Sequence, residues 1–180
     1  MLGITCFSLL FGDSFSMKNT THQDCANALG EMTMSFQELE NSLLELFSGL
    51  NNDADRTVGL IVGSALSFGR LCQVIGAVSK HRIQDPDLNE YLSGILNKCQ
   101  KLEEERNKYI HSFYPAFNLG DGLEVIGRLK HKVTKGGYAR QWDDHDPEKM
   151  RTLSFELDSS TREVNELLKS GELGFPSSSE

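Results

Sequence analysis

The stretch LNEYLSGILNKCQKLEEERNKYIHSFYP, residues 88–115, is the part of the sequence from which the fold is best predicted. Its apolar side chains recur every three or four residues, which is the period of an amphipathic helix with one buried face. They are Leu88, Tyr91, Leu92, Ile95, Cys99, Leu102, Tyr109, Ile110 and Phe113. Pro115 ends the pattern because proline lacks the backbone N–H that a helix interior needs. The stretch therefore predicts one long helix over residues 88–114.

Three other segments have helical spacing. Residues 31–50 are amphipathic, residues 55–80 are apolar almost all round, and residues 147–169 return to the amphipathic pattern. Asp87 is the expected N-cap of the helix over residues 88–114, and Asp146-Pro147 is expected to open the last helix with proline at its first position. These segments predict helices that pack side by side.

A short β-hairpin is expected between the third and the last helix. The run LEVIGRLKHKV, residues 123–133, partly alternates apolar and polar side chains, and Lys135-Gly136-Gly137 is typical of a turn. The predicted fold class is therefore all-α, a bundle of about four to five helices with this hairpin before the last one.

The chain has 180 residues, which suits one domain with tails. We expect a weakly ordered or short-helical N-terminal extension over residues 1–30, a helical domain over residues 31–170 and a flexible tail over residues 171–180. The opening residues 1–16 lack the basic start and cleavage site of a signal peptide, and Met17 offers a second start. Whether residues 1–16 belong to the native protein stays open.

Charge is distributed unevenly along the chain. The net charge is −8, from 26 acidic and 18 basic residues, which argues against nonspecific coating of nucleic acid. The segment from Lys98 to Arg140 reverses this balance, with nine basic residues against five acidic ones. It is either ordinary solvated surface or the border of a groove for an anionic partner.

Cysteines and apolar runs indicate a soluble protein of a reducing cytoplasm. None of the four cysteines forms a CxxC pair, so we expect no disulfide framework and no zinc site. Cys72 and Cys99 lie in apolar stripes, where a free thiol packs as a small hydrophobe. Residues 58–78 are apolar, but Arg70 at their centre would cost about 2.5–3.5 kcal/mol in a membrane, so a buried helix is predicted and no membrane partner.

One feature of the long helix needs a chemical explanation. On a helical wheel of about 100° per residue, Arg106 falls in the middle of the apolar arc. A guanidinium that faces a core needs a carboxylate, an opening or another subunit. Glu103, one turn earlier, offers a purely structural ion pair. Asn107 and His111 are four residues apart and are therefore neighbours on one flank of the helix.

The run Arg106-Asn107-Lys108-Tyr109-Ile110-His111 resembles the R-x(4–6)-H signature of the HEPN superfamily, helical-bundle proteins of prokaryotic toxin and defence systems. The polar residue after the arginine and the helical pattern over residues 31–170 are also similar. The resemblance implies a metal-independent endoribonuclease without cofactors, in which two subunits of a homodimer share one site. It implies that Arg106 holds and neutralises the scissile phosphate, that His111 moves protons, and that Asn107 orients His111 or the phosphate.

The resemblance also implies partners and regulation. RNA would be the substrate, and an antitoxin protein is an expected partner. If the basic segment borders an RNA groove, Lys108 and four residues of the hairpin are expected to bind the RNA, although a solvated strand face is an equal alternative for His131. Those four residues are Arg128, Lys130, His131 and Lys132. Some HEPN toxins carry H-x-Y, whereas this chain has Phe113 at that position, so regulation through a modified tyrosine is in doubt.

Several alternatives stay open. The domain could be a non-catalytic HEPN-like interaction or ligand-binding module with Arg106 in a structural ion pair. His111 could be an ordinary surface histidine. The acidic run of Asp143, Asp144, His145 and Asp146 is expected to be a solvated loop and not a metal site, because adjacent residues seldom converge on one ion.

Overall fold

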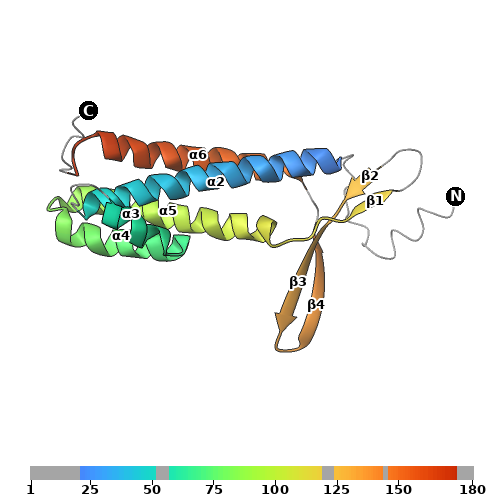
Figure 1. Ribbon diagram of the computed structural model, residues 1–180. Coiled ribbons are helices and arrows are strands. Elements are labelled where there is room, and N and C mark those ends of the chain that lie inside the picture. The colour runs from blue at the N-terminus through green and yellow to red at the C-terminus, as the bar shows by residue number, and fades with distance from the viewer. Residues whose placement is uncertain (1–20, 52–56, 119–123, 144–145, 174–180) are drawn as a thin grey trace. The chain divides into compact units, whose positions relative to one another are not determined.

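The computed structural model describes residues 21–51, 57–118, 124–143 and 146–173. Its elements are α2 (His22–Leu50), α3 (Thr57–Ser64), α4 (Phe68–Arg82), α5 (Pro86–Ile110), β1 (Ala116–Asn118), β2 (Glu124–Ile126), β3 (Arg128–Thr134), β4 (Gly137–Asp143) and α6 (Pro147–Lys169) (Figure 1). These elements confirm the predicted all-α class and the hairpin before the last helix. None of the helices in these ranges combines the length and the apolar character that a membrane span needs.

The chain divides into two compact units. The first unit comprises Met1–Glu31 and Arg106–Thr152, and the second unit comprises Met32–Glu105 and Leu153–Glu180. The first unit therefore contains the strands together with the last turn of α5, and the second unit contains most of the helical bundle.

Four helices enclose the core of the second unit. Figure 1 shows α2 beside α6, and a hydrogen bond of 2.7 Å joins Ser35 Oγ to Ser154 Oγ between them. Phe36 of α2 meets Phe68 of α4 with ring centroids 4.6 Å apart. The largest side chains of this unit that are almost completely buried are Met32, Leu39, Leu43, Leu46, Leu71, Cys72, Ile75, Leu92, Cys99, Leu157 and Val164. These residues confirm the apolar stripes predicted for residues 31–50 and 147–169. The stripe predicted over residues 88–114 is confirmed only in part, because Leu92 and Cys99 are buried whereas Tyr91 and Phe113 are exposed.

Helix α2 begins at His22, earlier than the expected residue 31. The reason is a reciprocal cap: Thr21 Oγ1 accepts the backbone N–H of Asp24 at 3.1 Å, and Asp24 Oδ2 accepts the backbone N–H of Thr21 at 3.3 Å. Such a capping box fixes the start of a helix. The Thr21 hydroxyl donates to Asp24 Oδ2 at 2.7 Å, and this bond, together with the one from the Thr21 backbone N–H, lowers the pKa of Asp24. Residues 1–20, which include Met17, lie outside the described part of the chain.

The prediction of a single helix over residues 55–80 is wrong. The segment forms α3 and α4, with a break between them. Backbone N–H groups of Ala65 and Leu66 bond to carbonyls three residues earlier, which tightens and ends α3. Ser67 is extended, with ψ of 155°, and precedes the first turn of α4. Arg70 of α4 is exposed and donates a hydrogen bond of 3.1 Å to Gln73.

Helix α3 approaches α2 through two glycines. A Cβ added at Gly59 would lie 2.6 Å from the Cα of Ser48, and one added at Gly63 would lie 2.7 Å from Leu44 Cδ2. Because Gly59 faces backbone, a side chain at this position has no room to be accommodated. The opposite side of α3 exposes apolar side chains, so the expectation of burial on every side is also wrong.

Helices α5 and α6 both begin at a proline that follows an aspartate. Asp85 Oδ1 accepts the backbone N–H of Asp87 at 2.9 Å and that of Leu88 at 3.3 Å, so the N-cap is Asp85 and the prediction of Asp87 is wrong. Pro86 then occupies the first helical position, where its missing N–H has no cost. The prediction for α6 is confirmed, because Asp146 Oδ1 accepts the backbone N–H of Glu148 at 3.2 Å before the helix.

The first unit contains an antiparallel ladder that extends beyond β1 and β2. The pair Ala116↔Ile126 belongs to the β1–β2 pairing, and Phe113↔Leu129 continues it in the same register. Pro115 contributes as an acceptor only, taking the backbone N–H of Gly127 at 3.1 Å. The sequence pattern predicted only the second of the two strand pairs.

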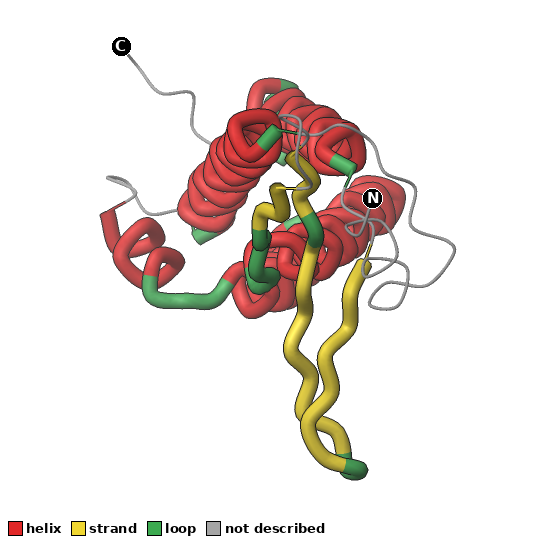
Figure 2. The backbone as a smooth tube through the Cα atoms, turned by 90° about the vertical axis from the view of Figure 1, so that its right-hand side faces the viewer, coloured by secondary structure: helices red, strands yellow, loops and turns green. Residues whose placement is uncertain are grey.

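The second strand pair is the predicted hairpin of β3 and β4, which Figure 2 shows as the longest pair of yellow strands, ending in a green turn. Thr134 pairs with Gly137 across the turn, and Gly137 has a φ of 116°, a conformation that favours glycine. Leu129 belongs to both strand pairs, because it lies opposite Phe113 on one side and opposite Trp142 on the other.

Among the described residues, Cys25, Cys72 and Cys99 are free and buried. This confirms that Cys72 and Cys99 pack as small hydrophobes. Burial raises the pKa of each of these two thiols from 9.0 to about 12.

We expect the protein to lose stability in alkali because of these two thiols. Between pH 9 and pH 12 the unfolded chain has released thiol protons that the folded chain keeps, so the free energy of unfolding falls as the pH rises. The loss from pH 9 to pH 10 should be about 1 kcal/mol per thiol, measured by urea unfolding. A Cys72→Ala/Cys99→Ala variant should show a shallower pH dependence, and an unchanged slope would contradict this explanation.

Candidate functional site

The last turn of α5 carries the residues that the sequence singled out. Arg106 and Asn107 are half-buried, and a guanidinium N–H of Arg106 donates a hydrogen bond of 3.0 Å to Asn107 Oδ1. His111 is the first residue after α5 and is exposed. Its backbone N–H donates to the carbonyl of Asn107 at 3.3 Å, so the imidazole joins the Arg106–Asn107 pair only through the backbone.

Helix α5 ends at Ile110 and not at Tyr114 as predicted. Side-chain hydroxyls satisfy the carbonyls of the last turn: Ser112 donates to Lys108 at 2.6 Å, and Tyr114 donates to Tyr109 at 2.9 Å. The residue before a proline also disfavours helix, so the chain is extended before Pro115. Burial raises the pKa of the Tyr114 hydroxyl above its usual range, which keeps it protonated as a donor.

Strand β3 is attached to this helix end by three contacts. The backbone of Phe113 donates to Leu129 at 2.9 Å and accepts from it at 2.8 Å. The guanidinium of Arg128 lies over the ring of Tyr109, 5.0 Å from its centroid. A cation over an aromatic ring contributes roughly 0.5–1 kcal/mol at an exposed site. The predicted RNA-binding residue Arg128 is therefore positioned against the turn that carries Arg106 and Asn107.

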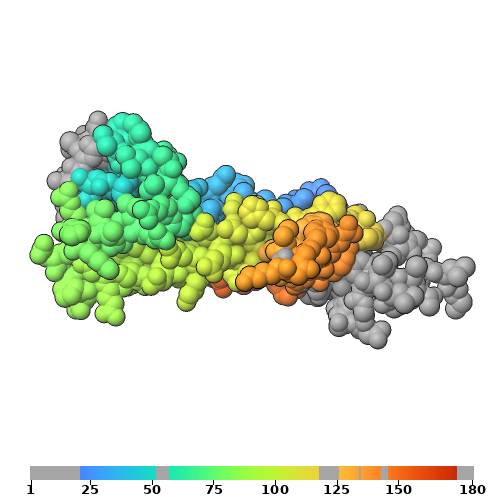
Figure 3. All heavy atoms as spheres, turned by 90° about the horizontal axis from the view of Figure 1, so that it is seen from below, coloured from blue at the N-terminus to red at the C-terminus, as the bar shows by residue number. Residues whose placement is uncertain are grey.

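The strand period divides the hairpin side chains into two faces. The lysine face carries Arg128, Lys130 and Lys132, and Lys132 Nζ donates to Gln141 Oε1 at 2.5 Å. The ring face carries Leu129, His131 and Val133, opposite Trp142, Arg140 and Tyr138. Cationic side chains lie on both faces, which gives the hairpin five basic residues against one acidic residue, Asp143. In Figure 3 the orange atoms of the hairpin lie uncovered toward the viewer.

The two faces differ at the base of the hairpin, where apolar packing anchors it. Leu129 is buried, and the rings of Trp142 and Phe117 lie with centroids 5.8 Å apart. Gly127 makes this possible, because a Cβ at this position would lie 3.2 Å from the Trp142 ring. The polar and cationic side chains toward the turn are exposed, except that Lys130 is half-buried.

The ring face holds a cluster that sequence reasoning missed. The hydroxyl of Tyr138 accepts a hydrogen bond of 3.1 Å from Arg140 Nε and is also hydrogen-bonded to His131 Nδ1. The signal was present in the sequence: a two-residue turn at Lys135-Gly136 places Val133 opposite Tyr138 and His131 opposite Arg140. Of the predicted RNA-binding residues, His131 belongs to this cluster, Lys130 and Lys132 to the lysine face, and Lys108 is exposed on α5.

Metal-binding clusters of three or more His, Cys, Asp or Glu side chains are absent from the described ranges. Asp144 and His145 of the acidic loop lie outside those ranges. At the end of α5, Arg106, Asn107 and His111 offer a guanidinium, an amide and an imidazole. These groups can bind a phosphate and transfer a proton.

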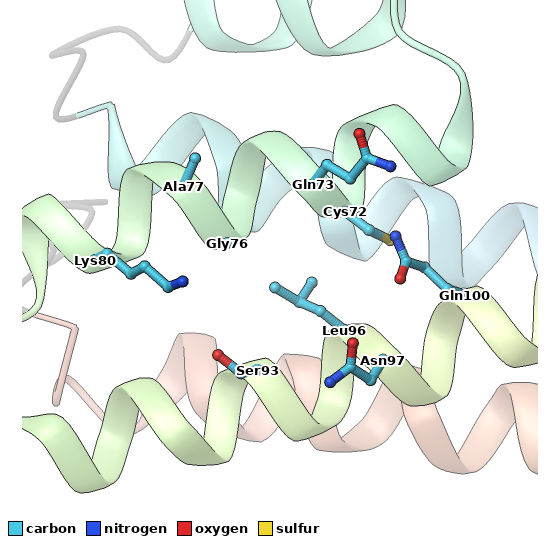
Figure 4. A pocket seen from close by; sticks show the side chains of 9 residues that line it. All are labelled: Cys72, Gln73, Gly76, Ala77, Lys80, Ser93, Leu96, Asn97 and Gln100. Atoms are coloured by element: carbon cyan, nitrogen blue, oxygen red, sulfur yellow. The ribbon is translucent and has the colours of Figure 1, made fainter.

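The second unit has a cavity of about 300 Å³ between α4 and α5 (Figure 4). The side chain of Lys80 points toward the space between the helices from one end, and Leu96 projects into it from α5. The other lining residues are Cys72, Gln73, Gly76, Ala77, Ser93, Asn97 and Gln100. The lining contains none of the residues that the sequence predicted for the site.

No family model, curated protein or solved structure matches this chain. The likeness to HEPN proteins thus rests on the residues of the motif and stays a hypothesis.

Proposed function

We propose that the protein is an RNA-binding endoribonuclease of the HEPN type that needs no metal ion. The proposal rests on one observation: the first unit contains both candidate catalytic residues and candidate RNA-binding residues. The Arg106–Asn107 pair and the exposed His111 lie at the end of α5, and the cationic hairpin is attached to the same helix end. An arginine suits a phosphate because its guanidinium matches phosphate geometry, and a histidine titrates near neutral pH.

The proposed roles follow from these groups. Arg106, oriented by Asn107, would neutralise the scissile phosphate. His111 would take the proton of the ribose 2′-hydroxyl as its oxygen attacks the phosphorus, or give a proton to the leaving 5′-oxygen. A single histidine is in one protonation state at a time, so two copies of His111 in a shared site could serve as base and acid together.

This sharing makes a homodimer part of the proposal. Support comes from α3, which exposes Val58, Ile61 and Val62 on one side, with 61%, 64% and 48% of their surfaces accessible. An apolar surface of this kind is typical of a site for association. A cytoplasmic toxin or defence effector with an antitoxin partner is the setting that the HEPN likeness implies.

Cleavage of RNA by the purified protein in EDTA tests the proposal directly. Product release that continues with the chelator supports a metal-independent ribonuclease. A failure to cleave single-stranded and structured RNA of varied sequence would instead leave a non-catalytic RNA-binding module. One observation favours that second function: the imidazole of His111 is outside the Arg106–Asn107 hydrogen bond.

RNA affinity should depend on the lysine face of the hairpin. We expect a Lys130→Glu/Lys132→Glu variant to bind RNA at least about tenfold more weakly and with a shallower salt dependence, because fewer phosphates are neutralised. Fluorescence anisotropy at several salt concentrations measures both effects.

The matched control for this variant is Lys80→Glu/Lys169→Glu, which makes the same change of charge at exposed positions of the second unit. Circular dichroism checks that both variants are folded. Equal losses of affinity in the two variants would show that RNA affinity depends on net charge alone. The hairpin would then not be part of the RNA-binding site.

A further inference from the structure

The ring face of the hairpin presents a flat aromatic surface near its turn. The planes of Tyr138 and His131 lie 27° apart, with ring centroids separated by 5.7 Å. The hydrogen bond between the Tyr138 hydroxyl and His131 Nδ1 joins the two rings at their edges, so together they extend one surface. Tyr138 is 58% exposed, which leaves room for a planar ligand.

This surface is held in place before any ligand arrives. Arg140 Nε donates to the Tyr138 hydroxyl at 3.1 Å, and the hydroxyl in turn can donate to His131 Nδ1. Two partners on one hydroxyl restrict rotation of the phenol. A ring that is already fixed loses less conformational entropy on binding than a mobile one.

One cation lies beside the rings, and a second lies on the other face of the hairpin. The guanidinium of Arg140 lies 5.9 Å from the Tyr138 centroid on the ring face, and Lys132 lies on the opposite face of the same strand pair. Aromatic rings bind bases by stacking, and adjacent basic side chains neutralise the backbone phosphates. A base within a duplex is already stacked on its neighbours and cannot stack on a protein ring without leaving the helix.

We infer that the Tyr138–His131 surface is a stacking platform for an unpaired base, so that the substrate of the proposed ribonuclease is single-stranded RNA. This inference rests on the proposed function for its biological setting, but the stacking itself does not require cleavage. Val133, directly opposite Tyr138 and 89% exposed, offers no ring and serves as the internal control.

Single-stranded DNA is the probe that separates binding from cleavage, because it lacks the 2′-hydroxyl and keeps the bases. A labelled strand of about 12 nucleotides matches the size of typical single-strand sites and is compared with its own duplex. We expect the wild-type protein to bind the strand at least about tenfold more tightly than the duplex. Tyr138→Ala should weaken strand binding about tenfold, since stacking of one base has that effect, and should leave duplex binding unchanged.

Two further variants distinguish stacking from other effects. Tyr138→Phe keeps the ring and removes the hydroxyl, so it should retain most of the affinity of the wild type. Val133→Ala should bind as the wild type does. Equal affinity for strand and duplex, or full strand binding by Tyr138→Ala, would overturn the platform.

The outcomes for the two proposals are separable. If the protein binds single-stranded DNA through Tyr138 but cleaves no RNA, the stacking platform is supported and the proposed ribonuclease activity is refuted. Cleavage that depends on His111, in a protein whose strand binding ignores Tyr138, supports the ribonuclease and removes the platform.

Discussion

Replacing either Arg106 or His111 by alanine is expected to lower the rate of RNA cleavage by about 10²–10⁴-fold, while the helical fold persists. On the proposed mechanism, loss of Arg106 removes the charge that stabilises the transition state. On the same mechanism, loss of His111 removes the group that transfers the proton. Rates are measured under single-turnover conditions in EDTA, with circular dichroism and thermal melting as checks on folding.

Lys108→Ala is the matched control, because Lys108 lies exposed on the same turn of α5. It should change affinity for RNA modestly and leave the cleavage rate of the bound complex unchanged.

The cleavage rate of Asn107→Ala should lie between that of Lys108→Ala and that of Arg106→Ala, since the lost hydrogen bond of 3.0 Å disturbs the orientation of Arg106. Sedimentation of the wild type at micromolar concentration should show a dimer, and an active monomer would refute the shared site.

The structural alternative predicts a different pattern for the same variants. If Arg106 serves only as an ion-pair partner for Glu103, Arg106→Ala lowers the melting temperature and His111→Ala has little effect. Full activity of His111→Ala would end the catalytic assignment. The melting data and the rates together therefore separate the two explanations.

Replacing Gly59 by alanine is expected to destabilise the second unit by about 1–3 kcal/mol, because an added Cβ would lie 2.6 Å from the backbone of Ser48. Helices α2 and α3 would have to separate to relieve this overlap. Urea unfolding of the wild type and the variant gives the difference in free energy.

The control for this substitution is Gly94→Ala on α5, where nothing lies within 4 Å of an added Cβ. This variant should be more stable than the wild type by about 0.5–1 kcal/mol, since alanine has the higher helix propensity. A destabilised Gly94→Ala, or a Gly59→Ala as stable as the wild type, would contradict the packing described for α3.

Helix periodicity predicted the bundle because a helix with one buried face has apolar residues at every third or fourth position. Leu39, Leu43 and Leu46 recur at helical spacing and are completely buried. The same reasoning failed over residues 55–80. A segment that is apolar on every side has no hydrophobic periodicity, so an interruption of the helix does not show in its pattern. Ser67 was the local signal for that break, because serine favours the position before a helix.

The candidate site was predicted in part for a similar reason. The spacing of Arg106, Asn107 and His111 is local, so it was visible in the sequence. The contacts of Arg128 with Tyr109 and of Phe113 with Leu129 join residues far apart in the chain, and no periodicity reveals them. Tyr138 was missed because its role depends on the register of β4 against β3, which only the turn length fixes.

The shared position of Leu129 has a consequence for inherited variation in this gene. Because Leu129 pairs with Phe113 and with Trp142, a codon inserted directly after Leu129 would shift every later residue of β3 to the opposite face. Lysines would then occupy the side of the rings, and His131 would leave Tyr138. One added residue would thus move side chains of β3 to the other face of the hairpin while β4 keeps its faces, whereas many substitutions at the exposed Val133 would be tolerated.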